Sequence, residues 1–209
     1  MKLMPILGLL VFLAAGPALA VTVTGGVDAT PHEIIESTAS AVTERLDGRK
    51  DYFDEHPGEL YVLVDELLLP HFDVRYAGRL VLGKHWKTAT KEQRDRFVEV
   101  FYRFLLQSYA NGILEIDQGS IKVLPADEQQ TEKRIVVKTE TRMDDGSEVP
   151  INYSMRKTKN GWRVYDVRIE GVSYVQNYRN QFNAEIAALG VDAVIERLNT
   201  EVAAAAAVD

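Results

Sequence analysis

The chain has 209 residues, and its 24 Lys and Arg against 31 Asp and Glu give a formal net charge of −7. This acidic balance argues against nucleic acid as a partner, because the phosphate backbone requires a positively charged protein surface. The chain has no cysteine, which excludes disulfides, thiolate nucleophiles and thiolate metal sites together.

The first twenty residues predict a secretion signal peptide. Lys2 supplies a positive charge, an apolar stretch runs from Leu3 to Leu13, and Ala18-Leu19-Ala20 has the small residues expected before a cleavage site. The apolar stretch is too short to span a bilayer comfortably. We therefore expect cleavage after Ala20 and an exported chain of residues 21–209 that forms a single domain.

Several stretches after residue 30 have the apolar spacing of helices. Thr30 and Glu33 form the pattern of a capping box, which predicts a helix from residue 31. A second capping box at Thr90 opens a long helix to about Gly112. Between them we expect a helix from Pro57 to about Pro70 and a shorter one over residues 72–83, for which Asp73 is the candidate N-cap.

The apolar period then changes from 3.6 to 2, which indicates strands. Asp144-Asp145-Gly146-Ser147 and Asn160-Gly161 are typical hairpin turns between neighbouring strands, so the pattern predicts an antiparallel meander. After Val164 the apolar residues change parity. A bulge near Asp166, or a strand buried on both faces, would explain that change.

Two more helices are expected near the end of the chain, over residues 174–189 and 191–202, with Gly190 between them. Glu170-Gly171, ahead of the first, is a predicted turn in which glycine permits a positive φ. Helices that are segregated from an antiparallel sheet define the α+β class.

The sequence has no motif for metal, nucleotide or acyl-transfer chemistry. Its four histidines, at 32, 56, 71 and 85, lack ligand spacing, and no glycine-rich phosphate loop or nucleophile elbow is present. Asp166 is the one candidate catalytic base, because it lies in a strand beside Tyr165. The structural alternative is an Asp166 that binds backbone amides at a bulge, or pairs with Arg163 or Arg168.

Two long segments carry a resemblance to a known family. Residues 162–182 read WRVYDVRIEGVSYVQNYRNQF, residues 81–109 read VLGKHWKTATKEQRDRFVEVFYRFLLQSY, and Leu-Pro-His-Phe-Asp stands at 69–73. These segments resemble the MlaC family, also called toluene-tolerance Ttg2-type proteins. The likeness covers roughly residues 31–200.

The resemblance implies a curved antiparallel sheet of about four strands, of the NTF2-like type, covered by several helices that enclose an apolar pocket. It implies a periplasmic carrier of glycerophospholipid without enzymatic activity, cofactor or metal. The implied partners are an inner-membrane ABC transporter complex that bears an MCE-domain protein, and an outer-membrane lipoprotein–porin complex. By exchanging lipid with both, such a carrier maintains the lipid asymmetry of the outer membrane.

The pocket wall would combine one face of the sheet with apolar side chains of two helices. Arg103, Arg156 or Arg179 are candidates for contact with the lipid phosphate, and the region Arg75–Lys87 is a candidate docking surface. The predicted lipid-binding residues are Phe97, Phe101, Phe104, Leu105, Tyr109, Ile135, Val137, Val149, Ile151, Tyr153, Trp162, Val164, Val172, Val175 and Tyr178.

Two other functions stay open at this point. An isomerase or hydrolase on an NTF2-like fold would use Asp166 as its base, and a peptide-binding module or chaperone would use the apolar groove for a polypeptide. An aromatic stripe fills a core by default, so the sequence alone does not distinguish a filled core from a hollow.

Overall fold

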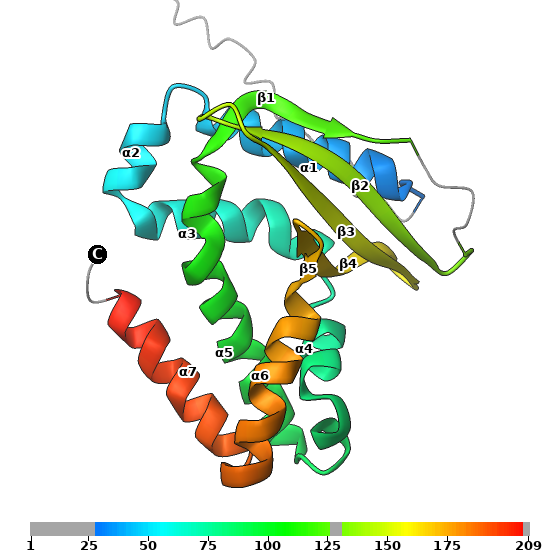
Figure 1. Cartoon of the computed structure of the whole chain (residues 1–209), viewed down its shortest axis with the longest axis vertical. Helices are drawn as coiled ribbons and strands as arrows, with labels where there is room; N and C mark the ends of the chain where they lie inside the picture. The colour runs from blue at the N-terminus through cyan, green and yellow to red at the C-terminus, as the bar shows by residue number, and fades with distance from the viewer. Residues whose placement is uncertain (1–27, 126–130, 207–209) are drawn as a thin grey trace, which may run out of the picture.

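An antiparallel sheet and a group of helices make up the computed structural model, which describes residues 28–125 and 131–206 (Figure 1). The predicted α+β class is confirmed. The expected signal peptide, with its cleavage site at Ala20, lies outside the described residues. Within the described ranges, no helix is both long and apolar enough to cross a membrane.

The described residues contain seven α-helices, and six of them agree with the sequence pattern. The pattern does not predict α2, because this helix has six residues and its N-cap, Arg49, makes no side-chain capping bond. The long helix α5 ends at Tyr109, and a 3-10 turn over Ala110–Ile113 continues it. The helices are α1 (Pro31–Leu46), α2 (Lys50–Glu55), α3 (Pro57–Leu68), α4 (Val74–Leu82), α5 (Lys91–Tyr109), α6 (Tyr174–Leu189) and α7 (Val191–Ala206).

Side-chain caps fix the starts of three helices where the sequence predicts them. The Thr30 amide donates to a Glu33 carboxylate oxygen over 2.8 Å, and the Glu33 amide donates to the Thr30 hydroxyl over 3.3 Å. The same reciprocal pair links Thr90 and Gln93 at the start of α5. Asp73 accepts a hydrogen bond from the amide of Tyr76 over 3.0 Å and caps α4. Each cap satisfies amides that the first helical turn leaves unpaired.

Five antiparallel strands form the sheet in the order β1-β2-β3-β4-β5. The two predicted hairpin turns connect β2 to β3 and β3 to β4, and Gly161 takes the left-handed φ of 89° that the second turn requires. The sequence predicts about four strands, and the structure has a fifth, which is only two residues long. The strands are β1 (Ile116–Val123), β2 (Arg134–Met143), β3 (Glu148–Thr158), β4 (Gly161–Ile169) and β5 (Val172–Ser173).

A bulge in β4 explains the change of parity seen in the sequence. Met155 of β3 pairs with Val164, but the preceding residue, Ser154, pairs with Asp166, so Tyr165 is an extra residue in β4. Paired residues share a face of the sheet. The bulge therefore keeps Val164 and the later apolar residue Val167 on one face, and the predicted bulge near Asp166 is confirmed.

Helix α1 packs on that face of the sheet, as Figure 1 shows. Ile34 and Ile35 of α1 form a buried cluster with Val137, Met155 and Val164 of the three central strands. These side chains are 0 to 5% exposed, so this part of the interface between the helix and the sheet is filled.

A second buried cluster lies away from the sheet, among α4, α5, α6 and α7. Phe97 and Phe101 of α5 stack with their ring centroids 5.5 Å apart, and both meet Phe182 of α6 edge to face. Val194, Ile195 and Leu198 of α7 complete the cluster. The aromatic stripes of α5 and α6 therefore meet each other.

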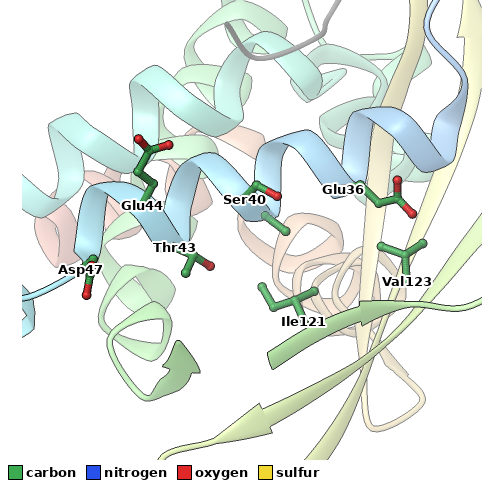
Figure 2. A pocket seen from close by; sticks show the side chains of 8 residues that line it. Glu36, Ser40, Thr43, Glu44, Asp47, Ile121 and Val123 are labelled. Atoms are coloured by element: carbon green, nitrogen blue, oxygen red, sulfur yellow. The ribbon is translucent and has the colours of Figure 1, made fainter. Parts of the chain in front are cut away.

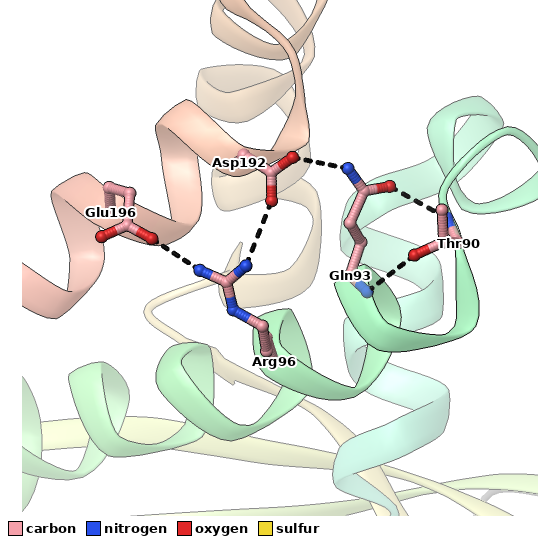
Figure 3. Close-up of polar contacts among 5 residues, drawn as sticks. All are labelled: Thr90, Gln93, Arg96, Asp192 and Glu196. Carbon is pink, nitrogen blue, oxygen red and sulfur yellow. Dashed lines mark hydrogen bonds and ion pairs between the residues drawn. The ribbon is translucent and has the colours of Figure 1, made fainter.

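A polar network holds the start of α7 against the start of α5 (Figure 3). Gln93, which already caps α5, also donates from Nε2 to Asp192 over 2.7 Å. The guanidinium of Arg96 bridges Asp192 at 3.4 Å and Glu196 at 2.5 Å. These bonds fix α7 over the aromatic cluster.

Candidate functional site

The predicted wall residues fall into two groups in the structure, one among the helices and one on the sheet. The helical group divides by burial. Phe97, Phe101 and Tyr178 are 0 to 5% exposed and belong to the aromatic cluster. Phe104, Leu105 and Val175 pack against the edge of that cluster and keep partial solvent contact. The second set therefore lies where the filled core of the helices ends.

The sheet group divides in the same way. Val137 and Val164 are buried beneath α1, and Ile135, Tyr153 and Trp162 pack against them with partial exposure. Val149 and Ile151 also lie at intermediate exposure on this face of β3. Burial raises the pKa of Tyr153 to about 12 although a hydrogen bond with Thr139 opposes the shift. The Tyr153 side chain is therefore largely, but not fully, removed from water.

Two predicted wall residues are largely exposed. Val172 of β5 is 58% exposed, and Tyr109 at the end of α5 is 40% exposed. The Tyr109 ring meets the Tyr174 ring edge to face at 4.6 Å, and its hydroxyl lies 2.7 Å from the hydroxyl of Tyr178. Burial is the main cause that raises the pKa of Tyr178, and this hydrogen bond adds to the shift. The three tyrosines form a polar spot at the edge of the aromatic cluster.

Two further tyrosines with defined contacts, Tyr174 and Tyr102, lie outside the predicted wall. Tyr174 continues the four-residue spacing of Tyr178 and Phe182, so its position was readable from the pattern. The bond from the Tyr102 hydroxyl to Asp65, 2.7 Å long, joins α5 to α3. No sequence signal connects Tyr102 and Asp65, because they are 37 positions apart.

Two open hollows formed by residues of the described ranges are lined mostly by polar side chains, whereas acyl chains require an apolar lining. The first, about 510 Å³, lies between α1 and β1, and Figure 2 shows Glu36, Glu44 and Asp47 around it with Ile121 and Val123. The second, about 740 Å³, lies beside the hairpin between β2 and β3. Of the predicted wall residues, Val149 alone lines either hollow, and most of its neighbours there are polar.

Asp166 is engaged as a structural carboxylate. It is 7% exposed, and its two oxygens accept hydrogen bonds from the Ser173 hydroxyl at 2.8 Å and the Val175 amide at 3.1 Å. Arg168 lies 3.7 Å away. The carboxylate therefore ties the bulge in β4 to the first turn of α6, the structural alternative that the sequence left open.

The candidate phosphate ligands lie apart from one another. Arg103 on α5 pairs with Glu99, Arg156 on β3 pairs with Asp73 at 3.4 Å, and the Arg179 side chain lies beside Gly83. No group of three or more His, Asp or Glu side chains is placed to hold a metal ion within residues 28–125 and 131–206.

Comparison with known proteins identifies the family. The model of the MlaC protein family matches residues 36–200. The chain belongs to the MlaC family. All of the predicted wall residues lie within the match, which covers both segments that carry the resemblance.

Two curated MlaC relatives align along most of their length. The toluene tolerance protein ttg2D of Pseudomonas putida is 31% identical over 176 residues, which cover 84% of this chain and 79% of the relative. The intermembrane phospholipid transport system binding protein MlaC of Haemophilus influenzae is 24% identical over 184 residues, 87% of this chain and 86% of the relative.

A solved structure supports the MlaC fold. The phospholipid-binding protein of Ralstonia solanacearum, solved in complex with a phospholipid, superposes with a TM-score of 0.77 at 24% sequence identity. The match covers 85% of this chain and 99% of the solved chain. Helices and sheet therefore have the same arrangement in both proteins.

Proposed function

We propose that this protein is a periplasmic phospholipid carrier. The observation that carries the proposal is its membership of the MlaC family, together with the names of its relatives. The Haemophilus influenzae relative is the binding protein of an intermembrane phospholipid transport system, and the Ralstonia solanacearum protein of the same fold was solved with a phospholipid. We propose no catalytic step, because Asp166 is occupied in holding the start of α6.

The chemistry of the cargo explains why a carrier would be needed. A lipid with two acyl chains hides roughly 30 CH₂ groups from water, which at about 0.8 kcal/mol each amounts to roughly 25 kcal/mol. Unassisted transfer through water is therefore slow. A carrier has to offer the chains an apolar surface that it can also give up at the destination.

The proposed binding surface uses the predicted residues at the edges of the two filled cores. Phe104, Leu105 and Val175 would contribute the helical side, and Ile151 and Tyr153 the side of the sheet. These side chains keep accessible surface, and covering them with acyl chains would be favourable. The deeply buried members of the predicted wall would support this surface from behind; they are Phe97, Phe101, Val137, Val164 and Tyr178.

We further propose that the carrier exchanges glycerophospholipid between two complexes. One is an inner-membrane ABC transporter complex with an MCE-domain protein, and the other is an outer-membrane lipoprotein–porin complex. The family membership supports this step. The headgroup would stay in water at the edge of the proposed binding surface, where it needs few fixed contacts.

Two substitutions test the proposed binding surface. Leu105→Asp and Ile151→Asp each place a carboxylate where an acyl chain would lie, and burying an unpaired charge is costly. Phospholipid that copurifies with each variant would be quantified by mass spectrometry, and folding would be checked by circular dichroism. Val62→Asp is the matched control, because Val62 is 59% exposed on α3.

We expect both variants to fold and to lose most of their lipid, while Val62→Asp keeps it. Folded variants that keep full lipid occupancy would contradict the proposed surface.

A further inference from the structure

Three arginines lie directly opposite one another on neighbouring strands of the sheet. Arg134 of β2 pairs in register with Arg156 of β3, and Arg156 pairs with Arg163 of β4. Residues opposite each other in antiparallel strands are about 4.5–5.5 Å apart at Cα. Like charges in such positions destabilise a sheet. This arginine row, Arg134–Arg156–Arg163, therefore calls for an explanation other than the stability of the fold.

All three guanidinium groups of the row are held in place, and among the described residues those of Arg134 and Arg163 have no acidic partner within ion-pair distance. Arg134 donates to the hydroxyl of Tyr76 over 2.9 Å, and Arg156 lies over the Tyr76 ring at 4.3 Å. Arg163 donates to the backbone carbonyl of Trp162 over 2.8 Å. Among the described residues, the row has one acidic partner. It is Asp73, which lies 3.4 Å from Arg156.

The row lies on the face of the sheet opposite to α1. Its residues alternate along the strands with Ile135 and Met155, which point toward the core under α1. Arg134 is exposed, and 31% of the Arg156 side chain is accessible. On α4, the exposed Arg79 lies one turn beyond Tyr76. A basic surface therefore extends from three strands to α4, in a chain whose net charge is −7.

We infer that the arginine row is a docking surface for an acidic region of a partner protein. The inference rests on the proposed function, since a carrier that exchanges lipid between complexes has to dock on them. The fork of donors on an arginine side chain matches carboxylates in pairs, and arginine and tyrosine are enriched where protein interfaces gain most of their affinity.

The composition of the surface favours a protein over a lipid bilayer. The large exposed apolar side chains of the described residues are Tyr52, Val62, Tyr109, Val172 and Leu189, and none belongs to the arginine row or to α4. Surfaces that bind membranes combine basic residues with apolar side chains that insert.

The test uses poly-L-glutamate of about 20 residues as an acidic probe, with its binding followed by fluorescence anisotropy at low salt. The variant is Arg134→Gln with Arg163→Gln, which leaves the Arg156–Asp73 pair intact. The matched control is Arg45→Gln with Arg103→Gln, which changes the net charge equally at two exposed ion pairs elsewhere. We expect affinity to fall about fivefold in the row variant relative to the control. Amide shifts caused by the probe in NMR spectra should concentrate on β2–β4.

Three results would overturn the inference. If the row variant and the control lost affinity for poly-L-glutamate equally, the probe would be attracted by the net charge of the protein and not by the row. Amide shifts outside the sheet and α4 would place the contact elsewhere. Binding of wild-type protein to vesicles rich in phosphatidylglycerol, lost in the row variant, with no binding of poly-L-glutamate, would assign the row to a membrane. Lipid content is measured on the same samples, so an empty wild-type protein would count against the carrier and not against the docking surface.

Discussion

The hydroxyl groups of Tyr109 and Tyr178 lie 2.7 Å apart and join the end of α5 to α6. The two residues differ in burial, since Tyr109 is 40% exposed and Tyr178 is 5% exposed. If Tyr178 is changed, water can replace the partner that Tyr109 loses. If Tyr109 is changed, the Tyr178 hydroxyl stays in a dry position without a partner, which is the costlier case.

We therefore predict that Tyr109→Phe lowers the free energy of unfolding by about 1–3 kcal/mol, and that Tyr178→Phe lowers it by less. The double variant should be more stable than Tyr109→Phe alone, because no hydroxyl is then left unpaired. Urea denaturation of the three variants measures their free energies of unfolding and so tests this order of stability. A Tyr178→Phe variant that is the least stable of the three would contradict this account of the pair.

Asp166→Asn should destabilise the fold. The amide has one acceptor oxygen, whereas the carboxylate accepts from both the Ser173 hydroxyl and the Val175 amide, and the negative charge also stabilises the start of α6. We expect the free energy of unfolding to fall by about 1–3 kcal/mol. For a chain of this size, each kcal/mol lowers Tm by about 2–4 °C. Thermal unfolding measures it, with exposed Asp51→Asn as the control. An unchanged Tm would return Asp166 to the list of candidate catalytic groups.

His71 should make stability depend on pH. Burial, and then the positive charge of Arg163, lower the pKa of this side chain in the folded state, whereas the unfolded chain has the ordinary value of about 6.5. As pH falls through about 6.5, the unfolded chain takes up a proton that folded His71 resists. The stabilising contribution is therefore complete above that pH and declines below it.

Urea denaturation between pH 7.5 and 5 would follow this decline, with His71→Gln as the comparison. The wild-type protein should lose stability over this range more steeply than the variant. Identical pH profiles would show that His71 does not contribute.

Gly78 permits the close approach of α4 to α5. A Cβ atom at this position would lie 2.8 Å from Cγ2 of Val98, and a β-branched valine has little freedom to move aside. We predict that Gly78→Ala lowers the free energy of unfolding by about 1–3 kcal/mol, although alanine favours helices by about 1 kcal/mol. Adding Val98→Ala should recover part of the loss. A Gly78→Ala protein that is more stable than the wild type would show that the helices separate readily.

The sequence predicts the local structure better than the wall of the pocket. Thr30, Thr90 and Asp73 cap helices where their side-chain chemistry indicates, because capping depends on residues within one turn. The bulge near Asp166 was readable from a change in apolar parity. In contrast, α2 has no capping residue, and β5 is too short to show a period.

The division between filled core and accessible surface depends on contacts that are distant in sequence. Phe101 and Phe104 belong to the same apolar stripe of α5, yet Phe101 is 3% exposed and Phe104 keeps more accessible surface. Packing of α6 and α7, some 80 to 100 positions later, determines that difference. The helical pattern therefore predicts that both residues face the apolar side of α5, and it does not show which one is buried in the core and which one keeps accessible surface.

The central claim is that the protein carries phospholipid. Native mass spectrometry of the protein, purified from the expressing cells without detergent, tests it most directly, with denaturing analysis of the released ligand. We predict a mass increase that corresponds to bound phospholipid in stoichiometric amount, with intact acyl chains. A folded protein that emerges from this procedure with no lipid, and that takes up none from vesicles, would contradict the claim.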